Sequence, residues 1–429
     1  MKEPATDRVF ASRPSLPWVV LGIAMLAVNL RAPIIAPTAV LGEIQADLGL
    51  TAAGAGLLTG LPVLLFALAT PLATRTIRRW GPEATVLLCL GGVLAGTVIR
   101  SLGPAAVVFA GTAIIGVALT LGNIVVPVLI RRDVPWNRVS AVTGAYSAIM
   151  NVGSMAALLG TAPLAALVGW RWALAAWAVV VIIGLAYWLP TARRRREALQ
   201  PDRSAASDKP SAHPAAAGGR GTDGPGTPIA PASKSLRGRS NRWIVAMLTV
   251  AFCGQSAAYY ATTTWLPLLL SDVRGLSSTA SGASASLFQV AAIVGALGVP
   301  LLAARTRLWV PTASIAVLWI SLPIGLLLAP DAYLLWSVTG GIAQGGGFTA
   351  IFSVIPRVAR TDQEAATASA RIQTGGYLAA TCAPPVAGWL NTLTGGWTAP
   401  LFLVLALVVA FGVAGLSAVQ ASERRYRLP

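Results

Sequence analysis

Long apolar runs and short polar connections alternate along almost the whole chain. A helix that crosses a lipid bilayer needs about 20 mostly apolar residues. Twelve runs of that kind begin near Pro17, Thr51, Ala84, Pro104, Arg138, Trp170, Asn241, Ser277, Leu308, Asp331, Glu364 and Gly396. The runs are continuous rather than alternating, which argues against a membrane β-barrel. The pattern therefore predicts an all-α membrane protein with twelve transmembrane helices.

One stretch of different composition interrupts this pattern. Residues 191–240 are rich in Pro, Gly, Ala and Ser, and they have too few apolar side chains to offset the entropy lost on ordering. We expect a disordered cytoplasmic linker there. It divides the chain into a tail at 1–16, a six-helix bundle at 17–190, a second six-helix bundle at 241–420 and a tail at 421–429. The first run is too long for a signal-peptide core, so we interpret it as the first spanning helix.

The two predicted bundles carry related segments. Residues 147–153 of the fifth helix read S-A-I-M-N-V-G, and residues 369–375 of the eleventh read S-A-R-I-Q-T-G. A second pair, at 71–76 and 300–306, follows the second and the eighth helix in the same order. A parallel duplication of six-helix halves is known in secondary transporters. We therefore expect two pseudo-symmetric bundles.

Composition supports a lipid environment. The chain is 55% hydrophobic and 11% charged, with a mean hydropathy of +0.70. A soluble domain carries about 25% charged residues. The net charge of +17 invites a nucleic-acid reading, but the basic residues form short clusters between apolar runs, which excludes nucleic acid and leaves membrane lipids as the expected partners.

The distribution of arginine predicts the orientation, because cytoplasmic loops carry an excess of basic residues. One set of loops holds Arg75, Arg78, Arg79, Arg131, Arg132, Arg138, Arg305, Arg307, Arg357 and Arg360, and both basic tails lie on that side. The opposite loops hold Glu43, Asp47, Asp272 and Asp331 with Arg100, Arg171 and Arg274. We expect a multi-pass plasma-membrane protein with both termini in the cytoplasm. Arg193 to Arg196 then read as a topology anchor, or as a site for specific lipids.

Enzyme and metal signatures are missing from the sequence. Cys89, Cys253 and Cys382 lie in apolar runs without metal-like spacing, and the only histidine, His213, lies in the predicted linker. There is no P-loop, no G-x-S-x-G and no histidine-containing triad. We expect no cofactor, no metal site, no enzyme and no ATP-driven pump.

Polar residues inside the spans are the candidate functional residues, because they are costly in lipid and usually face a cavity or the bundle interior. The first helix holds Asn29 and Arg31, and the arginine lies roughly 20 Å into the helix at 1.5 Å per residue. It could bind solute or act in gating, or it could donate to carbonyl groups of neighbouring helices.

Other spans supply further candidates. For solute binding we select Asn29, Arg31, Asn123, Gln255, Tyr259, Gln344, Gln373 and Tyr377, and for gating or the interface between halves Arg75, Asn151, Arg305 and Arg371. Gln255, Tyr259 and Thr262 share one helix face. Each amide could equally make a bond between helices. Arg371 could face a cavity or extend to the membrane surface.

All fifteen acidic residues lie in loops, tails, the linker or helix ends. A buried carboxylate is the usual device for coupling transport to protons. Its absence disfavours carboxylate-coupled symport of a cation. Buried arginine with neutral amides suits an anion, or a small polar molecule with acceptor atoms.

Several segments resemble one family in particular. They are Asn29-Leu30-Arg31 with Pro33, Gly122 to Pro127 with Arg131-Arg132-Asp133, Thr143-Gly144, Met150 to Gly153, Gly169 to Trp172, Gln255-Ser256 with Tyr259 and Trp265-Leu266-Pro267, Gln344-Gly345-Gly346, and Gln373 to Tyr377. The chain resembles the cyanate/nitroimidazole transporter family of the major facilitator superfamily. Thr74 stands where the superfamily usually has an acid and this family lacks one, whereas Arg371 departs from a usually apolar position.

The resemblance implies a major facilitator fold and substrates such as imported cyanate or exported nitroimidazole-type compounds. We expect a monomeric secondary transporter that moves a small polar solute by alternating access. An anion such as cyanate is the first expectation, with Arg31 binding its acceptor end. Efflux of nitroimidazole-like or other drug-like compounds is the alternative. A non-transporting membrane sensor or scaffold is a third reading, from a different class.

Overall fold

The computed structural model describes residues 16–135, 138–198, 239–307, 309–358 and 362–426. Its secondary structure in these ranges is helical, with no strand. The predicted all-α fold is confirmed. Most of the predicted linker, residues 199–238, lies outside the described part, so the prediction of disorder there is untested.

The helices follow the predicted runs closely. The first half contains α2 (Leu16–Ile35), the 3₁₀ helix η1 (Ala36–Val40), α3 (Leu41–Leu48), α4 (Ala52–Leu68), α5 (Thr70–Arg100), α6 (Ala105–Asp133), α7 (Val139–Ala176) and α8 (Ala178–Ala198). The second half contains α9 (Arg239–Arg274), α10 (Ser278–Arg305), α11 (Trp309–Leu328), η4 (Pro330–Ala332), α12 (Tyr333–Phe352), α13 (Ile355–Val358), α14 (Asp362–Thr394) and α15 (Thr398–Tyr426).

These helices provide twelve crossings. Eight helical stretches of the described chain are long and apolar enough to span a membrane. One of them, Val142–Arg195, has 54 residues, about 80 Å at 1.5 Å per residue, which is too long for one crossing. It turns at Gly169, whose φ of 80° is a left-handed conformation that favours glycine, and so crosses twice. The three remaining crossings are α4, α12 and α14.

One predicted boundary is too early. We placed the start of the linker at residue 191, but α8 continues to Ala198. Arg195 explains the extension, because its guanidinium forms ion pairs with Glu83 and Asp133 of neighbouring helices. These contacts hold the last turns of α8 in place beyond the apolar run.

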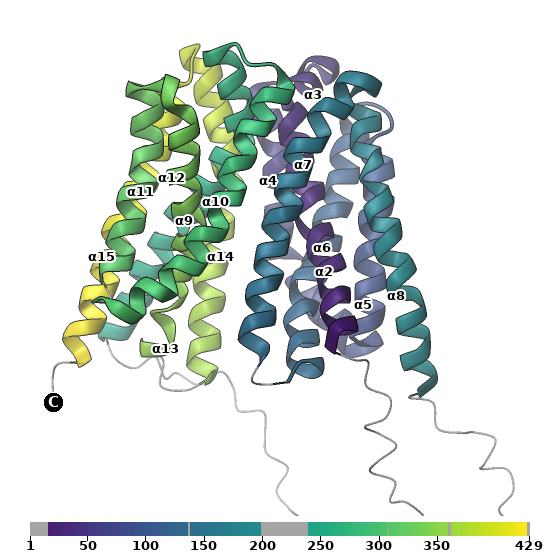
Figure 1. Cartoon of the computed structure of the whole chain (residues 1–429), viewed down its shortest axis with the longest axis horizontal. Coiled ribbons are helices and arrows are strands. Elements are labelled where there is room, and N and C mark those ends of the chain that lie inside the picture. The colour runs from purple at the N-terminus through teal and green to yellow at the C-terminus, as the bar shows by residue number, and fades with distance from the viewer. Residues whose placement is uncertain (1–15, 136–137, 199–238, 308, 359–361, 427–429) are drawn as a thin grey trace, which may run out of the picture.

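The helices form two bundles that lie side by side (Figure 1). The bundle of α2–α8 is purple to teal, and the bundle of α9–α15 is green to yellow. We call the face where α2 and α9 begin and α8 and α15 end the terminal face, which is the lower edge of Figure 1. The opposite one is the loop face.

Equivalent contacts recur in both bundles at the loop face. Gly49 and Gly275 have φ of 60° and 64°, and each is followed two residues later by a helix-capping hydroxyl, Thr51 or Ser277. The indole of Trp170 donates to Asp47 over 3.2 Å, and the indole of Trp397 donates to Asp272 over 2.9 Å. These matched pairs support the predicted duplication.

The bundles touch mainly in their loop-face halves. A Cβ atom at Gly56 would lie 2.5 Å from Pro384, and one at Gly60 would lie 2.5 Å from the Thr381 carbonyl, so α4 and α14 meet with no room for a side chain.

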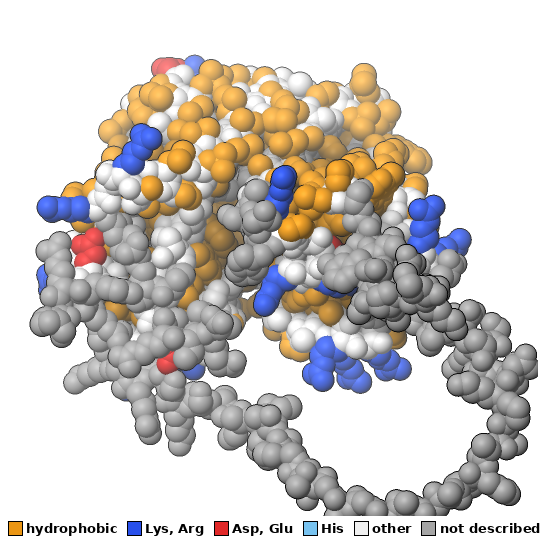
Figure 2. Space-filling view, turned by 60° about the horizontal axis from the view of Figure 1, so that its bottom comes forward, with side chains coloured by type: hydrophobic (Ala, Val, Ile, Leu, Met, Phe, Trp, Pro, Cys, Tyr) orange, Lys and Arg blue, Asp and Glu red, His pale blue; other side chains and the backbone are white. Residues whose placement is uncertain are grey.

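α7 and α10 meet in the same half, where a Cβ atom at Gly282 would lie 2.9 Å from the Leu158 carbonyl. Toward the terminal face the surface is hollowed between the two bundles (Figure 2). The bundles therefore pack tightly in their loop-face halves and are separated by a surface hollow toward the terminal face.

Candidate solute-binding site

The first crossing is broken near its centre. Pro33 lies in α2, and Pro37 lies in the 3₁₀ helix that follows. Proline has no backbone N–H, so each one removes a helical hydrogen bond to the carbonyl four residues earlier. The sequence therefore cannot continue a regular α-helix here. Arg31 lies just before the break, near the middle of the apolar stretch Leu16–Leu48.

Arg100 caps this break. Pro37 leaves the carbonyl of Pro33 without its α-helical donor, and Nη1 of Arg100 donates to that carbonyl over 2.7 Å. We predicted Arg100 in a loop, and that prediction is wrong, since its side chain is 1% exposed. Its Nε and Nη2 have no acceptor among the described residues. The spacing of the two prolines was the signal that sequence reasoning missed.

Arg31 points across to the second bundle. Its Nη1 donates to the hydroxyl groups of Tyr259 over 3.3 Å and of Tyr260 over 3.4 Å, and its guanidinium carbon lies 5.5 Å from the centre of the Tyr259 ring. Tyr146 of α7 and Tyr377 of α14 interact with the same charge at longer range. Arg31 and Tyr259, which we selected separately for solute binding, thus lie together, while Tyr260 and Tyr146 were not predicted.

The charge of Arg31 has no acidic partner within the described ranges. Both tyrosine bonds are long, because a charge-assisted hydrogen bond is normally about 2.7–2.9 Å. A guanidinium carries five N–H donors in a planar fork. The site therefore offers a positive charge and spare donors, enclosed by aromatic rings.

Two predicted binding residues have their amides hydrogen-bonded within the protein. Nδ2 of Asn29 donates to the Met25 carbonyl over 2.8 Å and faces Val180 of α8. Gln255 uses both ends of its amide, donating to the Gln344 carbonyl over 2.8 Å and accepting from the Trp319 indole over 2.6 Å. These bonds match the structural alternative that we left open for the amides.

The remaining amides are less fully used. The side chains of Asn123 and Gln344 are partly buried and form no hydrogen bond within the described chain. Gln373 donates to the Ser369 hydroxyl over 3.1 Å, and Asn151 donates to the Ser147 carbonyl over 3.0 Å. The two copies of the repeated segment therefore place their amides alike, each bonded four residues back.

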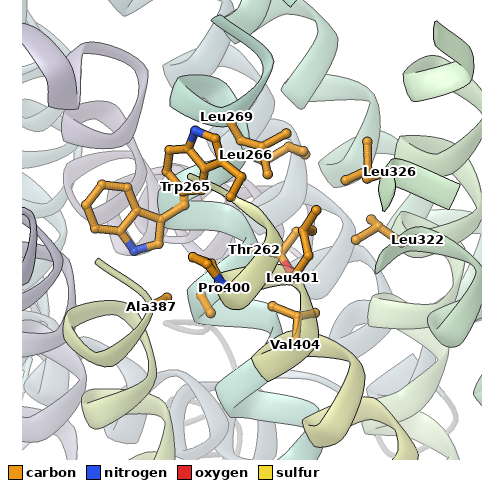
Figure 3. Close-up of a pocket in the computed structure, with 12 residues that line it drawn as sticks. Thr262, Trp265, Leu266, Leu269, Leu322, Leu326, Ala387, Pro400, Leu401 and Val404 are labelled. Atoms are coloured by element: carbon orange, nitrogen blue, oxygen red, sulfur yellow. The ribbon is translucent and has the colours of Figure 1, made fainter. Parts of the chain in front are cut away.

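A separate, small apolar cavity lies within the second bundle (Figure 3). Leucine and valine side chains from α9, α11 and α15 line it, together with Trp265 and Trp397. Thr262, which we predicted to share a face with Gln255 and Tyr259, lines this cavity, and its hydroxyl has no partner among the described residues. The three residues thus face different surroundings, and the cavity is distinct from the Arg31 site.

Comparison with known proteins identifies the family. Residues 18–339 match the family described as Major Facilitator Superfamily. The chain belongs to the Major Facilitator Superfamily. Together with its relatives, this membership makes the protein a membrane transporter rather than an enzyme.

Two relatives of this facilitator come from bacteria. It is 30% identical over 406 residues to the "Uncharacterized transporter YycB" of Bacillus subtilis, which covers 94% of this chain and 93% of the relative. It is 31% identical over 414 residues to the "2-nitroimidazole transporter" of Escherichia coli, which covers 95% and 96%.

A solved structure supports the fold. The bacterial homologue of the lysosomal transporter Spinster, in an inward-facing and unoccupied conformation, superposes with a TM-score of 0.71 and 16% identity, over 96% of this chain and 98% of that one. At this identity the likeness concerns the fold alone.

The residues predicted for gating in this facilitator are not joined by ion pairs. Arg75, Arg305 and Arg371 are exposed, and none has an acidic partner among the described residues. The choice for Arg371 between the cavity and the membrane surface stays open.

Instead, a four-residue ion-pair network lies at the terminal face of the first bundle. Arg132 contacts Glu83 over 2.5 Å and Asp133 over 2.9 Å, and Arg195 contacts Glu83 over 2.7 Å and Asp133 over 3.0 Å. Burial would raise the pKa of Glu83, but the bond from Arg132 and the charges of both arginines outweigh it, so the pKa lies below its usual value. The network ties α5, α6 and α8 together within one bundle.

Proposed function

We propose that this protein is a secondary transporter of small planar solutes with acceptor oxygen atoms, and that nitroimidazole-type heterocycles are its first substrate class. The guanidinium of Arg31 carries the proposal. It lies between the bundles, contacts tyrosines of the opposite bundle and has no carboxylate partner in the described chain. A nitro group offers two oxygen atoms that match the fork of a guanidinium.

The aromatic surroundings favour a heterocycle over a bare ion. Tyr259 and Tyr260 pack edge to face, with ring centres 4.9 Å apart, beside the guanidinium. Aromatic faces stack on planar rings and add binding energy that a ringless ion cannot use. The E. coli relative named for 2-nitroimidazole supports the same substrate class.

A small anion such as cyanate is the second candidate. The observation that favours it is the uncompensated positive charge itself, because an anion would neutralise Arg31 without a resident acid. No carboxylate at this site is available to carry a proton in the described chain, so coupling by exchange, uniport or protonation of the solute fits better than a carboxylate relay.

The transport cycle follows from how the bundles meet. In the proposed cycle, solute approaches Arg31 from the terminal face and replaces the long bonds to Tyr259 and Tyr260. Alternating access requires the bundles to rock about this site, so that α4 and α14 separate at the loop face. The basic loops and tails support a cytoplasmic position for the terminal face, and the plasma membrane is the proposed location.

The test is transport by the purified protein in proteoliposomes, with 2-nitroimidazole and cyanate as solutes side by side. Arg31→Met should abolish uptake of the true substrate, and Arg31→Lys should restore cyanate better than 2-nitroimidazole, because lysine cannot form the bidentate pair. Arg307→Met is the matched control, since it removes an exposed arginine of a loop. Uptake by Arg31→Met at the wild-type rate would refute the proposal.

A further inference from the structure

Five aromatic side chains form a continuous array between Arg31 and the terminal face. The array consists of Phe66 of α4, Tyr377 of α14, Phe252 of α9, and Phe348 and Phe352 of α12. The ring centres of successive members lie between 4.4 Å and 6.1 Å apart, within the range of favourable aromatic contact.

The array begins at the Arg31 site. Tyr377 interacts with the Arg31 charge, and its ring contacts Phe66 across the boundary between bundles at 6.1 Å and Phe252 within its own bundle at 5.9 Å. It ends at Phe352, the last residue of α12, where that helix reaches the terminal face. A solute that enters from this face therefore meets the array before it meets Arg31.

Phe348 leaves one face of the array open. Its side chain is 47% exposed, although it stacks on Phe352 with ring centres 4.4 Å apart. On α12, Gly347 packs on Gln255 of α9, and Gly345 packs on α10. Successive residues of a helix point about 100° apart, so Phe348 points to a direction between those of Gly347 and Gly345. Its side chain therefore leaves α12 between α9 and α10. Both helices contact the first bundle. The exposed ring therefore faces the space between the bundles rather than lipid.

Packing alone accounts for only part of the array. Phe252 is 3% exposed and fills the second bundle as an ordinary core residue. A core contact does not require a neighbouring phenylalanine to leave nearly half of its surface open on the pathway side. The open ring of Phe348 is thus a surface that a planar molecule can cover.

We propose that Phe348 and Phe352, supported by Phe252 and Tyr377, form an aromatic subsite that holds the planar ring of the solute on its way to Arg31. The inference rests on the proposed function and deepens it by separating two determinants of specificity. The guanidinium recognises the oxygen atoms of the solute, and the aromatic subsite recognises its ring. Solutes without a ring gain nothing from the second.

The experiment compares Phe348→Leu, which keeps apolar bulk but removes the ring, with Phe402→Leu, which removes an exposed phenylalanine of α15 outside the array. Equilibrium dialysis measures 2-nitroimidazole binding to purified protein, and nitroethane, which has a nitro group but no ring, serves as competitor. Phe348→Leu should raise the Kd of 2-nitroimidazole about two- to tenfold, the range of one aromatic contact. The Ki of nitroethane should stay unchanged, and Phe348→Trp should keep wild-type affinity.

An unchanged Kd for 2-nitroimidazole in Phe348→Leu would overturn the subsite. So would an equal loss of nitroethane binding, or an equal effect of Phe402→Leu. Failure of the proposed function looks different, because it appears as uptake that persists in Arg31→Met. The subsite is judged by the binding difference between ring and ringless solutes, which Phe348→Trp confirms in a folded protein.

Discussion

Replacing Glu83 by glutamine should destabilise the first bundle, because Glu83 is the acceptor for two arginines of the terminal-face network. Its carboxylate, 15% exposed, accepts from Arg132 over 2.5 Å and from Arg195 over 2.7 Å. Glu83→Gln keeps the shape of the side chain and removes its charge. The described residues of the second bundle form no equivalent ion-pair network. The loss of stability should therefore be confined to the contacts among α5, α6 and α8.

The expected magnitude follows from exposure. A hydrogen bond to a charged group contributes about 1.5–3 kcal/mol when protected from water, and an exposed ion pair about 0.2–1 kcal/mol. The Arg195 side chain is 22% exposed and the Arg132 side chain is 37% exposed, so the contribution of the Arg132 contact must be discounted for screening by solvent. We expect Glu83→Gln to lose about 1–2 kcal/mol in total.

The matched control is Asp331→Asn at the loop face. Asp331 also pairs with an arginine, Arg274, but its side chain is 79% exposed, so its loss should cost less than about 0.5 kcal/mol. Unfolding by SDS in mixed micelles measures both variants, and the Glu83 effect should shrink at high salt because part of it is screened. Equal effects of the two substitutions would refute the reasoning from exposure.

Three other predictions follow from single contacts. The lowered pKa of Glu83 means that its stabilisation is present above its unfolded pKa, about 4.3, and is lost as pH falls through the folded value, so acid titration should bring wild type and Glu83→Gln to equal stability. Gly60→Val should clash with the Thr381 carbonyl and disfavour loop-face closure, reducing uptake and exposing a cysteine probe at that face. Arg100→Met should change the free energy of unfolding by no more than about 2 kcal/mol, because it removes two unpaired donors as well as the bond to Pro33. It should nevertheless lower uptake, because the break in α2 loses its cap. Full uptake together with a large loss of stability would contradict this prediction.

Much of the fold was predictable from local sequence. Each spanning helix could be recognised by the length and apolar composition of its run, because a segment in lipid must satisfy its backbone hydrogen bonds internally. The repeated segments at 147–153 and 369–375 indicated two related bundles, and the matched Trp–Asp contacts at the loop face agree with them. The end of α8 was misplaced because its last turns are held by distant charges rather than by apolar residues.

The candidate site was only partly predictable. The depth of Arg31 in an apolar run marked it as unusual, and Tyr259 was selected from a different helix, but only the structure shows the hydrogen bond between them. The sequence did not reveal that both ends of the Gln255 amide are hydrogen-bonded, to the Gln344 carbonyl and the Trp319 indole, or that Arg100 is buried. The residue type of an amide or a guanidinium does not show whether its hydrogen-bond partner is a neighbouring helix or a solute.

The sequence by itself determined the helices, their approximate ends, the two-bundle organisation and the absence of acids deep within the apolar runs. Those properties depend on hydrophobic periodicity, proline and charge, which act locally along the chain. Only the tertiary structure decided which bundle surfaces touch, which polar side chains are already satisfied, and that the rings of Phe66, Phe252, Phe348, Phe352 and Tyr377 line up beside the pathway. These outcomes depend on contacts between residues far apart in sequence, and helix rotation and bundle docking set them together.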